Sequence, residues 1–175
     1  MFQPQGFVDK TPGIAMLRMI PDILLIWPQA KIIFAKRRGI ENIDSRLRKF
    51  PHVSFEEHCR QWQETMMYWY SLREKLDQGQ YVEIDQHDIE YVPEKATQQL
   101  ADFLHLSPEQ KGQMLQRFQE KHPEKTRQAY RMEIKSLDEM AWSKDEKLYF
   151  KKICSEAMDK FGYSYDSSYD QHASA

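Results

Sequence analysis

The chain has 175 residues, of which 41% are hydrophobic and 30% charged, and its formal net charge is −2. This length is sufficient for one domain with its own hydrophobic core. The small negative charge excludes a protein that binds nucleic acid through a general basic surface. The apolar run over residues 14–27 is interrupted by Arg18, Pro21 and Asp22. We therefore expect no transmembrane segment and no signal peptide.

The two cysteines, Cys59 and Cys154, lie far apart in the sequence, and the six histidines follow no metal-binding spacing. We expect reduced, buried thiols and no metal site. This composition is typical of a protein from a reducing, cytoplasmic setting.

The first half of the chain predicts two strands and four helical segments. Residues 7–10 are a candidate strand, followed by a helix over 14–20 that Pro21 interrupts and by a short helical segment over 22–27. The β-branched and aromatic run over 31–35 predicts a central strand covered on both faces, and 40–49 predicts a helix. Ser54 and Glu57 form a capping-box pattern that opens a helix over 55–76. Its apolar stripe, which predicts core packing, consists of Phe55, Cys59, Trp62, Met66, Trp69, Leu72 and Leu76.

The second half predicts one strand followed mainly by helices. Residues 81–85 form the strand, an acidic loop follows, and helices are expected over 93–104 and from Pro108. Residues 122–138 are polar and predict a long connection. A last helix begins after Ser143 and ends at Gly162, and the tail over 163–175 is rich in Ser, Tyr and Asp, which predicts disorder. The inward face expected for this helix is Leu148, Phe150, Ile153, Cys154, Ala157, Met158 and Phe161.

Strands that alternate with helices predict an α/β fold with a small parallel sheet flanked by helices and a helix-rich C-terminal half. We see no linker that would divide residues 1–162 into two domains. The sequence therefore predicts a single domain over 1–162 and a disordered tail over 163–175.

One segment indicates a phosphate site. The apolar run ends in Lys36-Arg37-Arg38, Gly39 follows, and Ser45 lies on the second turn of the expected helix. Backbone N–H groups at a helix start favour an anion, and an arginine adds charge-assisted hydrogen bonds. A charged strand end followed by a solvated helix face remains the alternative interpretation.

This arrangement resembles the sulfotransferase family, whose members transfer a sulfuryl group from 3′-phosphoadenosine 5′-phosphosulfate (PAPS). In that family an arginine at a strand end and a serine eight positions later hold the 3′-phosphate, and Arg37 and Ser45 match this pair. The turn Asp9-Lys10-Thr11-Pro12 resembles the family's Lys-Thr-Pro turn. Residues 81–106, YVEIDQHDIEYVPEKATQQLADFLHL, are similar to its block of strand, acidic loop, proline and helix.

The resemblance implies a three-layer, P-loop-like fold, PAPS as donor, adenosine 3′,5′-bisphosphate as product, and no metal. It places Lys10 at the sulfonate, with Asp9 as a candidate base or acceptor contact. Arg37, Ser45, Arg38 and Thr11 are the expected nucleotide-binding residues, although Arg38 could instead face solvent. Pro12 stands where the small-molecule branch has its catalytic histidine, which favours the branches that act on carbohydrates, proteins or bacterial metabolites.

The chain departs from the family pattern at one point. None of its six glycines frames the Gly- and Ser/Thr-rich loop that holds the 5′-phosphosulfate. We therefore expect either a fragment that starts after this loop or a shortened relative that lacks it. A second hypothesis is a non-catalytic binding or assembly module with the same fold. A small nucleotide kinase is disfavoured because the Walker-type loop is also missing.

The acceptor is expected to be a hydroxyl or amine on a small molecule, a carbohydrate or a protein, and not a nucleic acid. Whether the chain forms a homo-oligomer is left open by the sequence.

Overall fold

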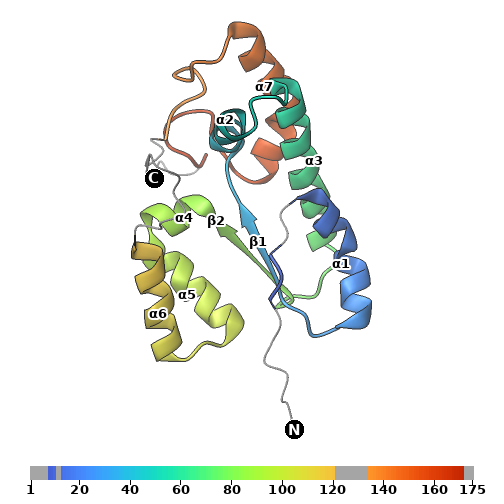
Figure 1. Cartoon of the computed structure of the whole chain (residues 1–175), viewed down its shortest axis with the longest axis vertical. Helices are drawn as coiled ribbons and strands as arrows, with labels where there is room; N and C mark the ends of the chain where they lie inside the picture. The colour runs from blue at the N-terminus through green and yellow to red at the C-terminus, as the bar shows by residue number, and fades with distance from the viewer. Residues whose placement is uncertain (1–7, 11–12, 121–133, 172–175) are drawn as a thin grey trace.

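The computed structural model describes residues 8–10, 13–120 and 134–171 (Figure 1). A small sheet lies between two groups of helices, which confirms the predicted α/β class. In chain order the elements are α1 (Ile14–Ile26), β1 (Ile32–Lys36), α2 (Gly39–Lys49), α3 (Phe55–Arg73), β2 (Tyr81–Asp85), α4 (Gln86–Tyr91), α5 (Pro93–Leu104), α6 (Pro108–Gln119) and α7 (Lys144–Lys160).

Strands β1 and β2 are parallel neighbours, with Ile32 opposite Tyr81 and Lys36 opposite Asp85. The two strands therefore end at the same edge of the sheet. Parallel α/β sheets commonly bind ligands outside the carboxyl ends of their strands. This edge is where Lys36-Arg37-Arg38 lead into α2.

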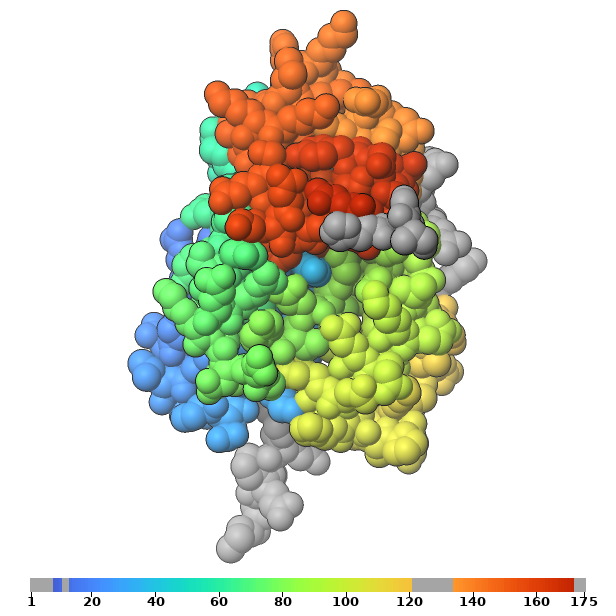
Figure 2. Space-filling model, turned by 180° about the vertical axis from the view of Figure 1, so that it is seen from behind, coloured from blue at the N-terminus to red at the C-terminus, as the bar shows by residue number. Residues whose placement is uncertain are grey.

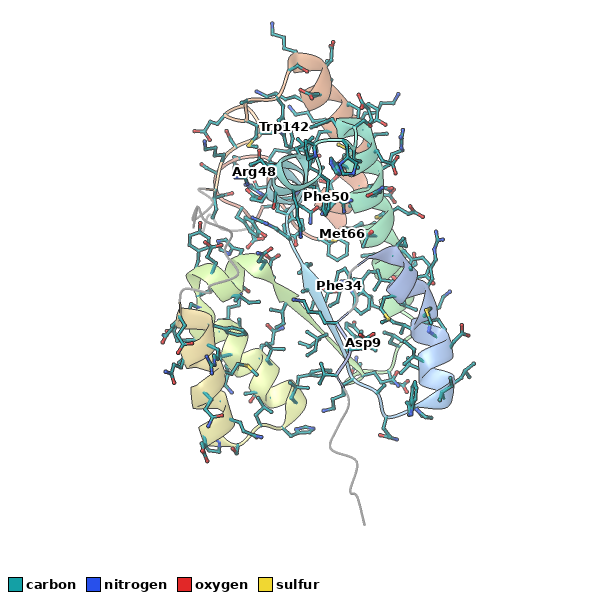
Figure 3. The ribbon with its side chains drawn as sticks, in the orientation of Figure 1. Asp9, Phe34, Arg48, Phe50, Met66 and Trp142 are labelled. Carbon is teal, nitrogen blue, oxygen red and sulfur yellow. The ribbon has the colours of Figure 1, made fainter. Side chains whose placement is uncertain are left out.

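One face of the sheet packs against α3, which also contacts α1, α2 and α7. Phe34 of β1 stacks on Trp69 of α3, with ring centroids 4.4 Å apart. Figure 3 shows Phe34 and Met66 pointing into this space. The predicted stripe is confirmed as core, since its buried members are Phe55, Cys59, Trp62, Met66, Trp69 and Leu72.

Among the described residues, the other face is covered by a helix over β2 only. Val82 and Ile84 pack with Ala96 and Leu100 of α5. On β1, Ile33 is 47% exposed within the described part of the chain. The expectation that this strand is covered on both faces is therefore wrong for these residues, because α5 lies over β2 and not over β1.

Three local expectations are corrected. Helix α1 continues through Pro21, because Leu17 and Ile20 are buried and α1 packs on α3, which outweighs the lost hydrogen bond. The expected acidic loop after β2 forms the short helix α4, whose start is capped by Asp85. In α7, Leu148 is 66% exposed although its spacing predicted an inward position.

The C-terminal segment over 163–171 packs into the domain, so the expectation of disorder is wrong for these residues. Tyr163 and Tyr169 are 1% and 3% exposed, and the backbone of Tyr163 pairs with that of Asp170. Polar composition suggested disorder, but the tyrosine rings bury enough surface to order the segment. Figure 2 shows it as the red part of the surface, continuous with α7. Residues 172–175 lie outside the described part.

The predicted connection over 122–138 is described only from Ile134 onward. There, Leu137 is buried and its N–H donates to the carbonyl of Tyr165 at 2.7 Å. This end of the connection is therefore attached to the C-terminal segment.

Candidate functional site

The cationic turn lies between the end of β1 and the start of α2. Arg38 is the N-cap residue of α2 and makes no side-chain capping bond to the helix. The first N–H groups of a helix have no partner within the helix, and together with the macrodipole they favour an anion.

Gly39 allows this helix start to lie tightly against the core. A Cβ there would be 3.1 Å from atoms of Phe150 and of Trp62, which come from α7 and α3. The backbone that enters α2 is therefore held directly against two core side chains.

Arg37 is half-buried at the end of β1, and burial lowers the pKa of its guanidinium. Glu41 and Tyr169 act in the opposite direction on this pKa, but burial outweighs them. A bound anion would offset the cost of burying this cation. Ser45 is also half-buried, on the second turn of α2, so the spacing of eight places it on the helix that Arg37 precedes.

From the sequence, Arg38 was expected either to contact the nucleotide or to face solvent, and the structure shows a third position. Its side chain is fully buried and does not face solvent. Its Nε and Nη2 donate to the carboxylate of Glu41. Its other guanidinium hydrogen bonds go to the carbonyls of Ser164, Asp166 and Lys135. These bonds use all five donors of the guanidinium, so the prediction that Arg38 contacts the nucleotide is not supported by this geometry.

Asp9, one of the two candidate catalytic residues, lies away from this turn. Asp9 and Lys10 are exposed in a segment without regular structure. In Figure 3, Asp9 lies near the beginning of the strands and Arg48 of α2 lies beyond their ends, with Phe34 between them. The structure does not bring Asp9 to the start of α2, and the roles of Asp9 and Lys10 stay predictions. Thr11 lies outside the described residues.

Three residues at this edge were not predicted from the sequence. Asp85 accepts hydrogen bonds from the phenols of Tyr163 and Tyr169, each at 2.6 Å. Burial and the charge of Asp85 raise the pKa of both tyrosines. The only signal in the sequence for the two tyrosines was the presence of three tyrosines in a tail that is otherwise polar.

A protein-family model described as "Sulfotransferase family" matches residues 3–111. The chain belongs to the sulfotransferase family. The match runs from before α1 into α6 and includes Lys10, Arg37 and Ser45. No curated protein and no solved structure matches the chain.

The sulfotransferase domain also has a cavity of about 300 Å³ at the carboxyl ends of its strands. Its charged lining residues are Lys36, Lys95, Glu83, Asp85, Asp88 and Asp170. Lys36 pairs with Glu83 at 3.2 Å and Lys95 with Asp88 at 2.8 Å. Burial and the nearby Asp85 raise the pKa of Asp170. Both lysines of this cavity are therefore paired with carboxylates, and Asp85 and Asp170 form no ion pair among the described residues.

Within the described ranges, no cluster of His, Cys, Asp and Glu side chains has the arrangement needed to hold a metal ion. None of the helices described here is long and apolar enough to cross a bilayer.

Proposed function

We propose that this chain binds PAPS and transfers its sulfuryl group to a hydroxyl or amine acceptor. The observation that carries the proposal is the position of Arg37 at the carboxyl end of β1, directly before the uncapped start of α2 that carries Ser45. These residues lie within the segment that the sulfotransferase family model matches.

The chemistry of this turn fits a phosphate group. Arg37 supplies a planar cationic fork, Ser45 a hydroxyl donor, and the helix start N–H groups that have no partner within the helix. Glu41 lies in the first turn of α2 and would repel an anion, but its ion pair with Arg38 compensates this charge. The 3′-phosphate of PAPS is the group that these residues would hold.

In the transfer step, the acceptor oxygen or nitrogen bonds to sulfur while the bond between sulfur and the 5′-phosphate oxygen breaks. The acceptor proton passes to a base, and adenosine 3′,5′-bisphosphate leaves. Lys10 is the proposed cation that offsets charge on the leaving phosphate, and Asp9 is the proposed base. Thr11 is proposed to contact the same end of the nucleotide.

The acceptor class is proposed only as a small molecule, a carbohydrate or a protein. The cysteines Cys59 and Cys154 are buried free thiols. They support a reducing setting such as the cytoplasm.

The test is a thermal-unfolding comparison of the chain with adenosine 3′,5′-bisphosphate and with adenosine 5′-monophosphate. At 100 times the dissociation constant, a ligand stabilises the native state by about 2.7 kcal/mol. For a domain of this size we expect a rise in Tm of about 5–10 °C. The bisphosphate should give this shift and the monophosphate a smaller one, because only the bisphosphate has the 3′-phosphate.

Arg37→Ala and Ser45→Ala should remove the difference between the two nucleotides. The matched controls are Arg18→Ala and Ser71→Ala, which delete the same groups at exposed positions on α1 and α3. Equal shifts with both nucleotides in the wild type would contradict the proposal. So would loss of the difference in the control variants.

A further inference from the structure

The peptide group between Arg37 and Arg38 is hydrogen-bonded on both sides. Its carbonyl, which belongs to Arg37, accepts from Nε1 of Trp62 at 3.1 Å. Its N–H, which belongs to Arg38, donates to the phenol oxygen of Tyr169 at 3.1 Å. Because a peptide group is planar, these two bonds fix its orientation. The same orientation sets the direction in which the backbone leaves Arg37 and enters α2.

Tyr169 connects this peptide to the neighbouring strand. The phenol that accepts from Arg38 also donates to Oδ1 of Asp85, the last residue of β2, at 2.6 Å. One hydroxyl group therefore joins the turn after β1 to the end of β2. The bond to a carboxylate is charge-assisted and hence among the stronger hydrogen bonds.

The side chain of Arg38 fixes Tyr169 from the opposite direction. Its guanidinium lies 4.9 Å from the centroid of the Tyr169 ring. It also donates to the carbonyls of Ser164 at 3.2 Å and Asp166 at 2.6 Å, in the same C-terminal segment. The turn and the segment therefore hold each other in place, although they are separated by more than 120 residues in the chain.

The backbone of Tyr169 is in an uncommon conformation. Its φ is 69°, in the left-handed region that residues other than glycine rarely adopt. An unfavourable backbone angle persists where surrounding contacts determine it, and such residues cluster at functional sites. Here the ring also stacks on His87 of α4 at 4.2 Å between centroids.

We propose that Tyr169 is a positioning residue for the anion site of Arg37 and Ser45, acting through the Arg37–Arg38 peptide. This inference rests on the proposed function, because the anion is taken to be the 3′-phosphate of the nucleotide. Tyr169 touches the backbone that presents Arg37, so removal of its hydroxyl should weaken the 3′-phosphate contact in particular.

The structure provides a matched control. Tyr163 also donates to Asp85 at 2.6 Å and is as deeply buried, but no hydrogen bond described here joins it to Arg38. Tyr169→Phe and Tyr163→Phe therefore each remove one bond to the same carboxylate. Only Tyr169→Phe also removes the acceptor of the Arg38 N–H.

The first measurement is the ratio of affinities for adenosine 3′,5′-bisphosphate and adenosine 5′-monophosphate, by titration calorimetry. A general loss of structure lowers both affinities together, whereas misplacement of Arg37 lowers this ratio. We expect Tyr169→Phe to reduce the ratio by about fivefold or more, and Tyr163→Phe to keep it within about twofold of wild type.

The second measurement needs no ligand. Amide hydrogen exchange followed by NMR should show the Arg38 N–H exchanging about tenfold faster in Tyr169→Phe than in Tyr163→Phe. If Tyr169→Phe does not fold, the inference is tested on the wild-type chain. There, the amide of Arg38 must exchange as slowly as the amide of Ile43 in α2. Exchange at the rate of an exposed loop overturns the inference.

The outcomes separate the two proposals. A wild-type chain that binds both nucleotides equally contradicts the proposed function, and the inference falls with it. A wild-type preference for the bisphosphate that Tyr169→Phe leaves unchanged overturns the inference alone. An equal reduction of the ratio in both variants also overturns it, since the effect would then come from Asp85.

Discussion

Arg38 and Glu41 form an ion pair inside the protein at the first turn of α2, with Nε of Arg38 donating to Oε2 of Glu41 at 2.8 Å. Both side chains are almost completely removed from solvent. The pair therefore contributes stability only while both partners are present.

Replacement of one partner should be costly. Arg38→Met leaves the Glu41 carboxylate buried without a counter-charge, and we expect a loss of about 3–5 kcal/mol in the free energy of unfolding. Urea denaturation measures this loss. The double variant Arg38→Met/Glu41→Gln should be less destabilised than Arg38→Met alone.

An exposed ion pair is the control for this experiment. Arg18 pairs with Glu64 at 2.7 Å, with both side chains more than half exposed. Arg18→Met should change the free energy of unfolding by no more than about 1 kcal/mol. A double variant as unstable as Arg38→Met alone would show that the burial of Glu41 is not the source of the loss.

Replacement by alanine should have opposite effects on the stability of the domain at Gly39 and at Gly112. A Cβ at Gly39 meets Phe150 and Trp62 at 3.1 Å, whereas a Cβ at Gly112 on α6 meets no atom of the described residues within 4 Å. We expect Gly39→Ala to destabilise by about 1–3 kcal/mol through overpacking. Gly112→Ala should stabilise by about 0.5–1 kcal/mol, because alanine is the better helix former.

Urea denaturation of the two variants, compared with wild type, measures this difference. Two variants of equal stability would mean that the aromatic side chains move aside at Gly39 without cost.

Glu83 should make the stability of the domain decrease at acidic pH. Burial raises the pKa of its carboxyl, but hydrogen bonds from Arg73 and Trp69 outweigh burial, so the pKa is lowered overall. A carboxyl with a lowered pKa stabilises the folded state above its unfolded pKa of about 4.3. This stabilisation is lost as the pH falls from there through the lowered folded pKa.

Glu83→Gln should therefore be less stable than wild type at pH 7, by about 3 kcal/mol. The difference should shrink as the pH falls below about 4. Thermal unfolding from pH 3 to pH 7 measures both the difference in stability at pH 7 and its decrease at low pH. Glu64→Gln, at an exposed pair, should show little change, and a constant difference for Glu83→Gln at all pH values would contradict the assignment.

Local patterns in the sequence were sufficient to predict most of the helices and strands. β2 and α5 have the predicted bounds, and Ser54, predicted to open α3, accepts a hydrogen bond from the N–H of Glu57. These signals act between residues three or four apart in the chain, so they can be read without knowledge of the fold. α1 departs from its pattern because packing against α3 outweighs the local effect of Pro21.

The sequence alone determined the cationic turn, the spacing of Arg37 and Ser45, and the resemblance that the family model confirms. The tertiary structure decided what each cation does. Arg37 and Arg38 are adjacent and chemically identical, yet Arg38 is fully buried against Glu41 and three distant carbonyls. It also decided that Tyr163 and Tyr169 belong to the core. These contacts join residues that are far apart in the chain, so their energies depend on the arrangement of the folded elements and leave no periodic pattern in the sequence.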